Sequence, residues 1–177
     1  MMLGGFKYLG TMRSKRKKFM LAMAAVLLLI QFIQPDRSTP ASDPVNDMLE
    51  VTKAPGDIRQ LVVGACYDCH SYRTTYPWYG YVTPMSFIVQ QHINEGREHL
   101  NFSLWDRYAA SEEAGEAGEE LQEGEMPPGY YRLMHAHARL SDAEKQQLAT
   151  WFNTHGRGRG EERDGGVPAR EDDEHAH

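Results

Sequence analysis

The stretch Cys66-Tyr67-Asp68-Cys69-His70 decides how this chain is interpreted, because it has the spacing C-x-x-C-H. This spacing is the pattern for covalent haem attachment. Two thiols three positions apart can each add to one vinyl group of haem and form a thioether, and the adjacent imidazole can bind the iron from one face. We therefore predict that Cys66 and Cys69 hold one covalent haem c, with His70 as the proximal iron ligand.

Zinc sites and thioredoxin-like redox centres also use C-x-x-C. A structural zinc site usually takes four Cys or His ligands, often from a second C-x-x-C, whereas this chain has two cysteines. A thioredoxin-like centre needs a βαβ context, and the sequence before Cys66 has helical periodicity instead. Zinc and dithiol chemistry remain the alternatives to haem attachment.

An apolar run from Phe19 to Ile33, interrupted only by Gln31, directly follows five basic residues between Arg13 and Lys18. This order is typical of a secretory signal and obeys the positive-inside rule. The run is shorter than the roughly 20 residues that span a bilayer, which suits a cleaved signal peptide, but Thr39-Pro40-Ala41 is a poor cleavage site. We expect a single-pass signal anchor in the cytoplasmic membrane, with the rest of the chain on the periplasmic side. A cleaved, soluble exported form is the alternative.

Composition shifts divide the 177 residues into five segments. We predict a basic cytoplasmic N-terminus (1–18), a signal anchor or signal peptide (19–35), a linker rich in Pro, Ser and Asp (36–53), one globular domain (54–155) and a disordered polar tail (156–177). A domain this small gains core from a bound porphyrin.

The net charge of −6 hides a segregation along the chain. Residues 1–33 carry six basic and no acidic residues, which leaves 13 basic against all 25 acidic residues in the exported part, a net charge of −12. This balance argues against a nucleic-acid partner and favours a redox partner with a basic docking face, although a solvated acidic surface gives the same pattern.

Periodicity predicts an all-α domain. Asp57 is expected to cap a helix that ends at the two cysteines, and Pro84 to open a helix that runs to about Leu100. Ser141-Asp142-Ala143-Glu144 is a capping box, expected to open a helix that Gly156 closes. Between the first two helices lies an aromatic loop, expected to cover the haem edge or protein core, with Tyr72, Tyr76, Trp78, Tyr79 and Tyr81.

Met126 is the predicted distal iron ligand. It lies in Gly124-Glu125-Met126-Pro127-Pro128-Gly129, where the two prolines stiffen the loop that presents the thioether. Met85 and Met134 lie in apolar helical patterns, which favour core positions. The alternatives for the distal position are a histidine among His92, His135 and His137, or an open site.

Taken together, these motifs resemble the haem-binding domain family of small, membrane-anchored or exported, cytochrome c-like proteins. The resemblance covers residues 54 to 152 and rests on Cys66–Ser71, Thr75–Tyr79, Pro84–Ser86, Gly96-Arg97, Asn101–Ser103, Met126–Pro128, Tyr130, His135 and Leu140-Ser141. It implies a cytochrome c-like helical fold around a single haem held by Cys66, Cys69 and His70. The acidic stretch from Glu112 to Glu125, with three glycines, is looser than such a core would suggest.

A haem with both axial positions filled has no vacancy for a substrate, which favours an electron carrier over an enzyme. The competing class is a haem sensor or a peroxidase-like protein, with an open or weakly ligated distal site and a distal His92 or Tyr130. A haem-transfer module is disfavoured, because thioether attachment is effectively permanent.

Overall fold

A computed structural model describes the backbone of residues 5–156 and the side chains of residues 14–156. Within this part of the chain the structure is all-helical, without a strand, which confirms the predicted fold class at the level of a small helical domain. The predicted polar tail lies outside the described residues except for Gly156. The α-helices are α1 (Gly5–Leu29), α2 (Met48–Val51), α3 (Gly56–Ala65), α4 (Tyr67–His70), α5 (Met85–His99), α6 (Trp105–Tyr108), α7 (Glu112–Glu123), α8 (Gly129–Met134) and α9 (Asp142–His155).

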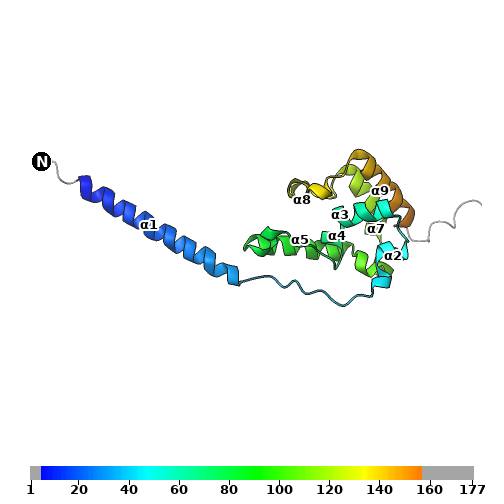
Figure 1. Ribbon diagram of the computed structural model, residues 1–177, viewed down its shortest axis with the longest axis horizontal. Helices are drawn as coiled ribbons and strands as arrows, with labels where there is room; N and C mark the ends of the chain where they lie inside the picture. The colour runs from blue at the N-terminus through cyan, green and yellow to red at the C-terminus, as the bar shows by residue number, and fades with distance from the viewer. Residues whose placement is uncertain (1–4, 157–177) are drawn as a thin grey trace, which may run out of the picture.

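Helix α1 extends away from the packed helices, as Figure 1 shows. It contains the first part of the predicted anchor, and a 3₁₀ turn, Ile30–Phe32, follows it. Across residues 5–156, no helix is both long enough and apolar enough to cross a membrane. The signal anchor therefore stays a prediction.

Helix α3 leads directly into the haem motif. Cys66 is its C-cap, and the single-turn helix α4 then carries Cys69 and His70, as the periodicity predicted. The prediction that Asp57 caps α3 is wrong. Pro55 occupies the N-cap, and Asp57 lies in the first turn, where its carboxylate accepts a 2.5 Å hydrogen bond from the side chain of Gln147 on α9.

Helices α5 and α9 match the predicted elements. Pro84 is the N-cap of α5, which ends at His99. Helix α9 opens with the capping box: the Ser141 hydroxyl accepts from the Glu144 backbone N–H at 3.3 Å, and the Ser141 backbone N–H donates to the Glu144 carboxylate at 2.7 Å. Gly156 follows as the C-cap.

The acidic stretch after Ser111 is not loose, contrary to expectation. It forms helix α7, which ends at Gly124 in the left-handed conformation (φ 81°) and packs closely on α9. A methyl group at Gly118 would lie 2.6 Å from the Asn153 side-chain oxygen and 2.8 Å from the Ala149 carbonyl oxygen. The glycine that suggested looseness is therefore what allows the two helices to approach.

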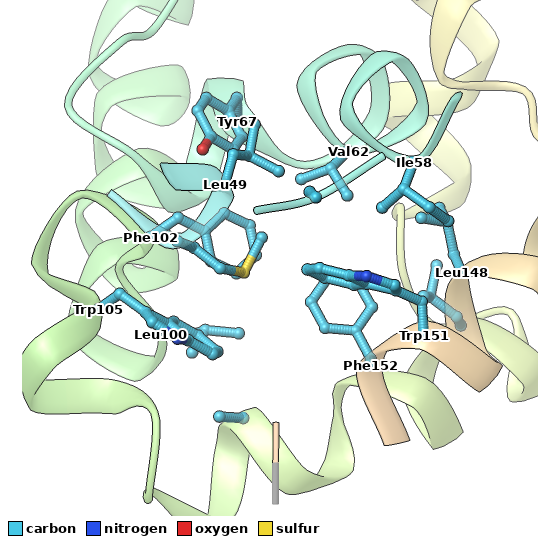
Figure 2. Packing of buried hydrophobic residues seen from close by; sticks show 14 of the residues in the cluster. Leu49, Ile58, Val62, Tyr67, Leu100, Phe102, Trp105, Leu148, Trp151 and Phe152 are labelled. Atoms are coloured by element: carbon cyan, nitrogen blue, oxygen red, sulfur yellow. The ribbon is translucent and has the colours of Figure 1, made fainter. Parts of the chain in front are cut away.

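One hydrophobic core joins α2, α3 and α9 to the segment around Phe102 (Figure 2). The Phe102 ring stacks on Phe152 with centroids 6.0 Å apart. Met48 and Leu49 are fully buried in this core although they precede the predicted domain start at residue 54. The core begins earlier because Asp47 caps α2 and accepts a 2.5 Å hydrogen bond from the Tyr67 hydroxyl.

Candidate haem-binding site

The haem motif lies at a largely apolar cavity of about 750 Å³, a volume within the range of cofactor sites. Cys66, Cys69 and His70 line one part of it. The apolar face predicted for α5 lines another part, with Met85, Ile88, Val89, His92 and Ile93. Helices α7 and α8 and the loop between them contribute further residues, among them Leu121, Met126, Pro127, Pro128, Tyr130, Tyr131 and Met134.

A hydrogen bond to the backbone fixes the orientation of the His70 imidazole. Its Nδ1 lies 2.9 Å from the Leu100 carbonyl oxygen, so Nδ1 carries the proton and donates. Burial lowers the pKa of His70, against two backbone hydrogen bonds that raise it, and the imidazole is neutral at neutral pH. Nε2 is then the unprotonated nitrogen, which is the form that ligates iron.

The two thiols are protonated in the protein without haem. Burial raises the pKa of Cys66 to about 12, with a smaller contribution from Cys69. Burial, with a smaller contribution from the Asp68 charge, raises the pKa of Cys69 to about 11. Both cysteines are free rather than joined in a disulfide, so both sulfurs are available for thioether formation.

Helix α5 crosses the haem motif at Gly96. A methyl group at this position would lie 2.9 Å from the Cys69 carbonyl oxygen, closer than real Cβ contacts. Arg97 then reaches over the same turn, with its Nε donating to the Ser71 carbonyl oxygen at 2.8 Å. Gly96-Arg97 is one of the motifs on which the family resemblance rests. In the structure, Gly96 lets α5 approach Cys69, and Arg97 binds the backbone just after the haem motif.

Three thioethers line the cavity. Met126, the predicted distal ligand, is 38 % exposed, and its backbone N–H donates to the Glu120 carbonyl oxygen at 3.1 Å. Met85 and Met134 also line the cavity and are exposed, so their predicted core positions are wrong. Helical periodicity could not tell these roles apart, because a face that packs on protein and a face that lines a cofactor cavity have the same spacing.

The three alternative distal histidines lie in different places. His92 lines the cavity, and its Nδ1 lies 3.3 Å from the Tyr130 hydroxyl. His135 and His137 are not among the lining residues. His135 is buried under Tyr131, with ring centroids 4.0 Å apart, and its Nε2 lies 2.7 Å from the Tyr79 hydroxyl.

The segment that follows Met126 is attached to the haem motif. The Tyr131 hydroxyl donates to the Asp68 carboxylate at 2.7 Å, and burial together with this bond raises the pKa of Tyr131. The Tyr79–His135 contact makes a second attachment, from the aromatic loop. Sequence reasoning missed these partners of Asp68 and His135, because their separations of 63 and 56 residues leave no local pattern.

The aromatic loop divides between two roles. Pro77, Trp78 and Tyr79 line the cavity, as expected for residues that cover a haem edge. Tyr76 instead donates to the Gln90 side chain at 2.6 Å, and Tyr72 lies under Arg97, whose guanidinium is 5.3 Å from the ring centroid.

These residues fit a haem: the cavity is of cofactor size and mostly apolar, and it presents two thiols and one correctly protonated imidazole. The family model described as Haem-binding domain matches residues 25–154. The chain belongs to this family. Haem binding is thereby established as its general property. The match begins at residue 25, within α1, so the family pattern includes the segment before the predicted domain start. No curated protein and no solved structure matches the chain.

Proposed function

We propose that this chain is an electron-transfer protein with one covalent haem c, bound through Cys66 and Cys69, and with His70 and Met126 as axial ligands. The observation that carries the proposal is the arrangement of His70: its Nδ1 proton is committed to the Leu100 carbonyl oxygen, which leaves Nε2 as the nitrogen able to bind iron. Met126 lines the same cavity as His70. When bound, the haem supplies a one-electron redox centre.

The protein's own residues then have separable tasks. The two cysteines make attachment permanent, and the Leu100 carbonyl holds the proximal imidazole in one orientation. The Pro127-Pro128 pair and the Tyr131–Asp68 hydrogen bond restrain the segment that carries Met126. Such restraint matters because a thioether is a weak iron ligand. A segment that is already held in place loses little conformational entropy when its methionine binds the iron.

We further propose that the apolar run in and after α1 attaches the protein to the cytoplasmic membrane, with the haem domain on the periplasmic side. The basic residues that precede the run support this orientation. The redox partner is then a protein of the same compartment, with a basic face opposite the exported acidic surface.

The decisive experiment is an absorption spectrum of the protein produced with a haem-attachment system, in the oxidised and reduced states. Thioether-type reduced bands together with the far-red methionine-to-iron band are expected. Reduced bands that shift to those of haem with intact vinyl groups would contradict covalent attachment. Covalent haem without the far-red band would contradict Met126 as ligand.

A second candidate function is a haem sensor or a peroxidase-like protein. One contact favours it: His92 and Tyr130 both line the cavity, their rings are 5.1 Å apart, and the hydroxyl lies 3.3 Å from His92 Nδ1. This pair could act on a diatomic ligand or on peroxide at an open iron position. A high-spin spectrum that shifts with carbon monoxide in the unsubstituted protein would favour it over electron transfer.

A further inference from the structure

We propose that the end of the haem domain formed by Trp78, Tyr81, Val82 and Phe87, here called the aromatic edge, is a lipid-facing surface that rests on the bilayer. The inference deepens the membrane attachment proposed above and rests on it. It goes beyond attachment because it fixes which face of the domain meets the lipid, and therefore which end of the haem cavity lies closest to the membrane.

The segment directly after α1 is bound to this end of the domain, instead of forming a free linker. The Gln31 side-chain amide pairs with the backbone of Thr83 in both directions: Nε2 donates to the carbonyl oxygen at 3.0 Å, and Oε1 accepts from the N–H at 2.9 Å. The Thr83 hydroxyl donates to the Ile33 carbonyl oxygen at 2.8 Å and accepts from Gln34 Nε2 at 3.1 Å.

Arg37 extends the contact. Its guanidinium donates to the Gly80 carbonyl oxygen at 2.6 Å and lies over the ring of Tyr81, 4.9 Å from the centroid. Residues 31–37 therefore contact the domain from Gly80 to Thr83, and α1 ends beside the start of α5 (Figure 1). Little chain remains to separate the apolar run from the domain, so a run held in lipid would hold this end of the domain at the lipid surface.

The aromatic edge has the composition of an interfacial surface. Trp78 is 75 % exposed, whereas the other two tryptophans, Trp105 and Trp151, are buried. Tyr81 of the same turn, Val82 directly after it and Phe87 in the first turn of α5 are exposed as well. Tryptophan and tyrosine are enriched where a membrane meets water, because each has an apolar ring and a polar group that reaches the headgroups.

The charge pattern favours a bilayer over a basic redox protein at this surface. No acidic residue occurs between Cys69 and Asn94, or between residues 1 and 35, although the exported part of the chain is strongly acidic. The cation bound at this surface is Arg37, whereas Arg73 pairs with Asp47 beside Tyr67. Asp36 is the one carboxylate in the bound segment; it accepts hydrogen bonds from Ser38 and is followed directly by Arg37. An apolar surface with so little negative charge is compatible with anionic headgroups and offers little to a basic protein.

The consequence concerns electron exchange. Trp78 of the aromatic edge lines the haem cavity, as do the neighbouring Pro77 and Met85. With the edge on the bilayer, this end of the cavity lies at the membrane surface, while Glu113, Glu116 and Glu120 of α7 line another part of it. Electron exchange at the aromatic edge would then take place in the plane of the membrane.

The test uses the full-length, haem-loaded protein in vesicles of phosphatidylcholine and phosphatidylglycerol. A nitroxide is attached in Val82→Cys and, as the matched control, in Val63→Cys on α3; the two valines are 41 % and 48 % exposed. Electron paramagnetic resonance then compares access of oxygen, which concentrates in lipid, with access of a water-soluble nickel complex. We expect the label at position 82 to favour oxygen and the label at position 63 to favour nickel.

Nickel-type access at both positions, in protein that floats with the vesicles, would overturn the lipid-facing surface and leave membrane attachment intact. Protein that does not float would overturn attachment and this inference together, whereas the haem spectrum tests electron transfer independently. The unsubstituted protein is labelled in parallel, and its signal is subtracted as background. Its two cysteines are Cys66 and Cys69, so strong labelling would mean that these thiols are free and would count against thioethers there. Phe87→Cys replaces Val82→Cys if the latter does not take up haem.

A second pair of variants tests the bound segment. In the Val82→Cys background, Thr83→Val removes the hydroxyl that contacts Ile33 and Gln34, and Thr83→Ser keeps it. We expect Thr83→Val to shift the label from oxygen toward nickel access, and Thr83→Ser to leave it unchanged. Equal behaviour of the two would contradict the role assigned to residues 31–37.

Discussion

The Tyr131 hydroxyl lies 2.7 Å from the Asp68 carboxylate, so the segment that carries Met126 is joined to the haem motif by a hydrogen bond to a charged group. Asp68 stands between the two cysteines and also accepts the Thr75 backbone N–H at 2.8 Å. One of the two x positions of C-x-x-C-H therefore holds two segments that line the cavity, through Thr75 and Tyr131.

Tyr131→Phe is expected to lower the free energy of unfolding by about 1–3 kcal/mol, because hydrogen bonds to charged groups contribute in this range. The ring remains and keeps its stacking on His135. Denaturant unfolding measures the loss, and amide exchange should localise it to α8. Tyr130→Phe is the control on the same helix, since its hydroxyl makes only the 3.3 Å contact with His92. Equal losses in the two variants would contradict the role of Asp68.

Met126→Ala is expected to lower the reduction potential by on the order of 0.1–0.2 V and to open the iron to carbon monoxide, because axial ligands set haem potentials over about 0.8 V. Met85→Ala and Met134→Ala are the matched controls, since both thioethers line the same cavity. Redox titration and carbon monoxide spectra measure the effect. An unchanged potential in Met126→Ala, or a larger change in a control variant, would show that Met126 is not the distal ligand.

The double variant Cys66→Ala/Cys69→Ala is expected to abolish covalent haem and to destabilise the domain, because part of its core is then missing. Haem staining after denaturing electrophoresis measures attachment. Each single variant should keep one thioether. Its reduced bands should lie between those of haem with two thioethers and those of haem with both vinyl groups intact. Covalent haem in the double variant would disprove the assignment of the motif.

Gly96→Ala is expected to destabilise the domain by about 1–3 kcal/mol, the cost of an overpacked contact. The added methyl group would meet the Cys69 carbonyl oxygen, and backbone cannot rotate away as a side chain can. Haem loading should fall with it. Gly115→Ala on α7 is the control: nothing lies within 4 Å of the added group, so we expect a gain of about 0.5–1 kcal/mol from helix propensity.

The capping box of α9 predicts a pH dependence. Hydrogen bonds from the backbone and hydroxyl of Ser141 lower the pKa of Glu144 below its ordinary value of 4.5. A lowered carboxyl pKa gives stability that is present above the ordinary value and is lost as the pH falls through the folded-state value. Ser141→Ala should therefore lower the melting temperature by a few degrees at pH 7 and by less near pH 3. Equal shifts at the two pH values would contradict the linkage.

The sequence by itself determined the haem motif, the all-helical class and the limits of α5 and α9. These features are local: thiol spacing, a capping box and a 3.6-residue periodicity are complete within a few turns of chain. The acidic stretch shows the limit of such reasoning, because its glycines suggest a loose segment until α9 is seen packed against Gly118.

Only the tertiary structure decided which side chains share the cavity. It places His92, Met85 and Met134 along the cavity and His135 behind Tyr131, and it brings the Leu100 carbonyl oxygen to His70 and Thr83 to Gln31. The last two contacts join groups 30 and 52 residues apart, and both use backbone atoms that every residue has. A backbone acceptor leaves no mark in the sequence, so its partner is known only once the chain is folded.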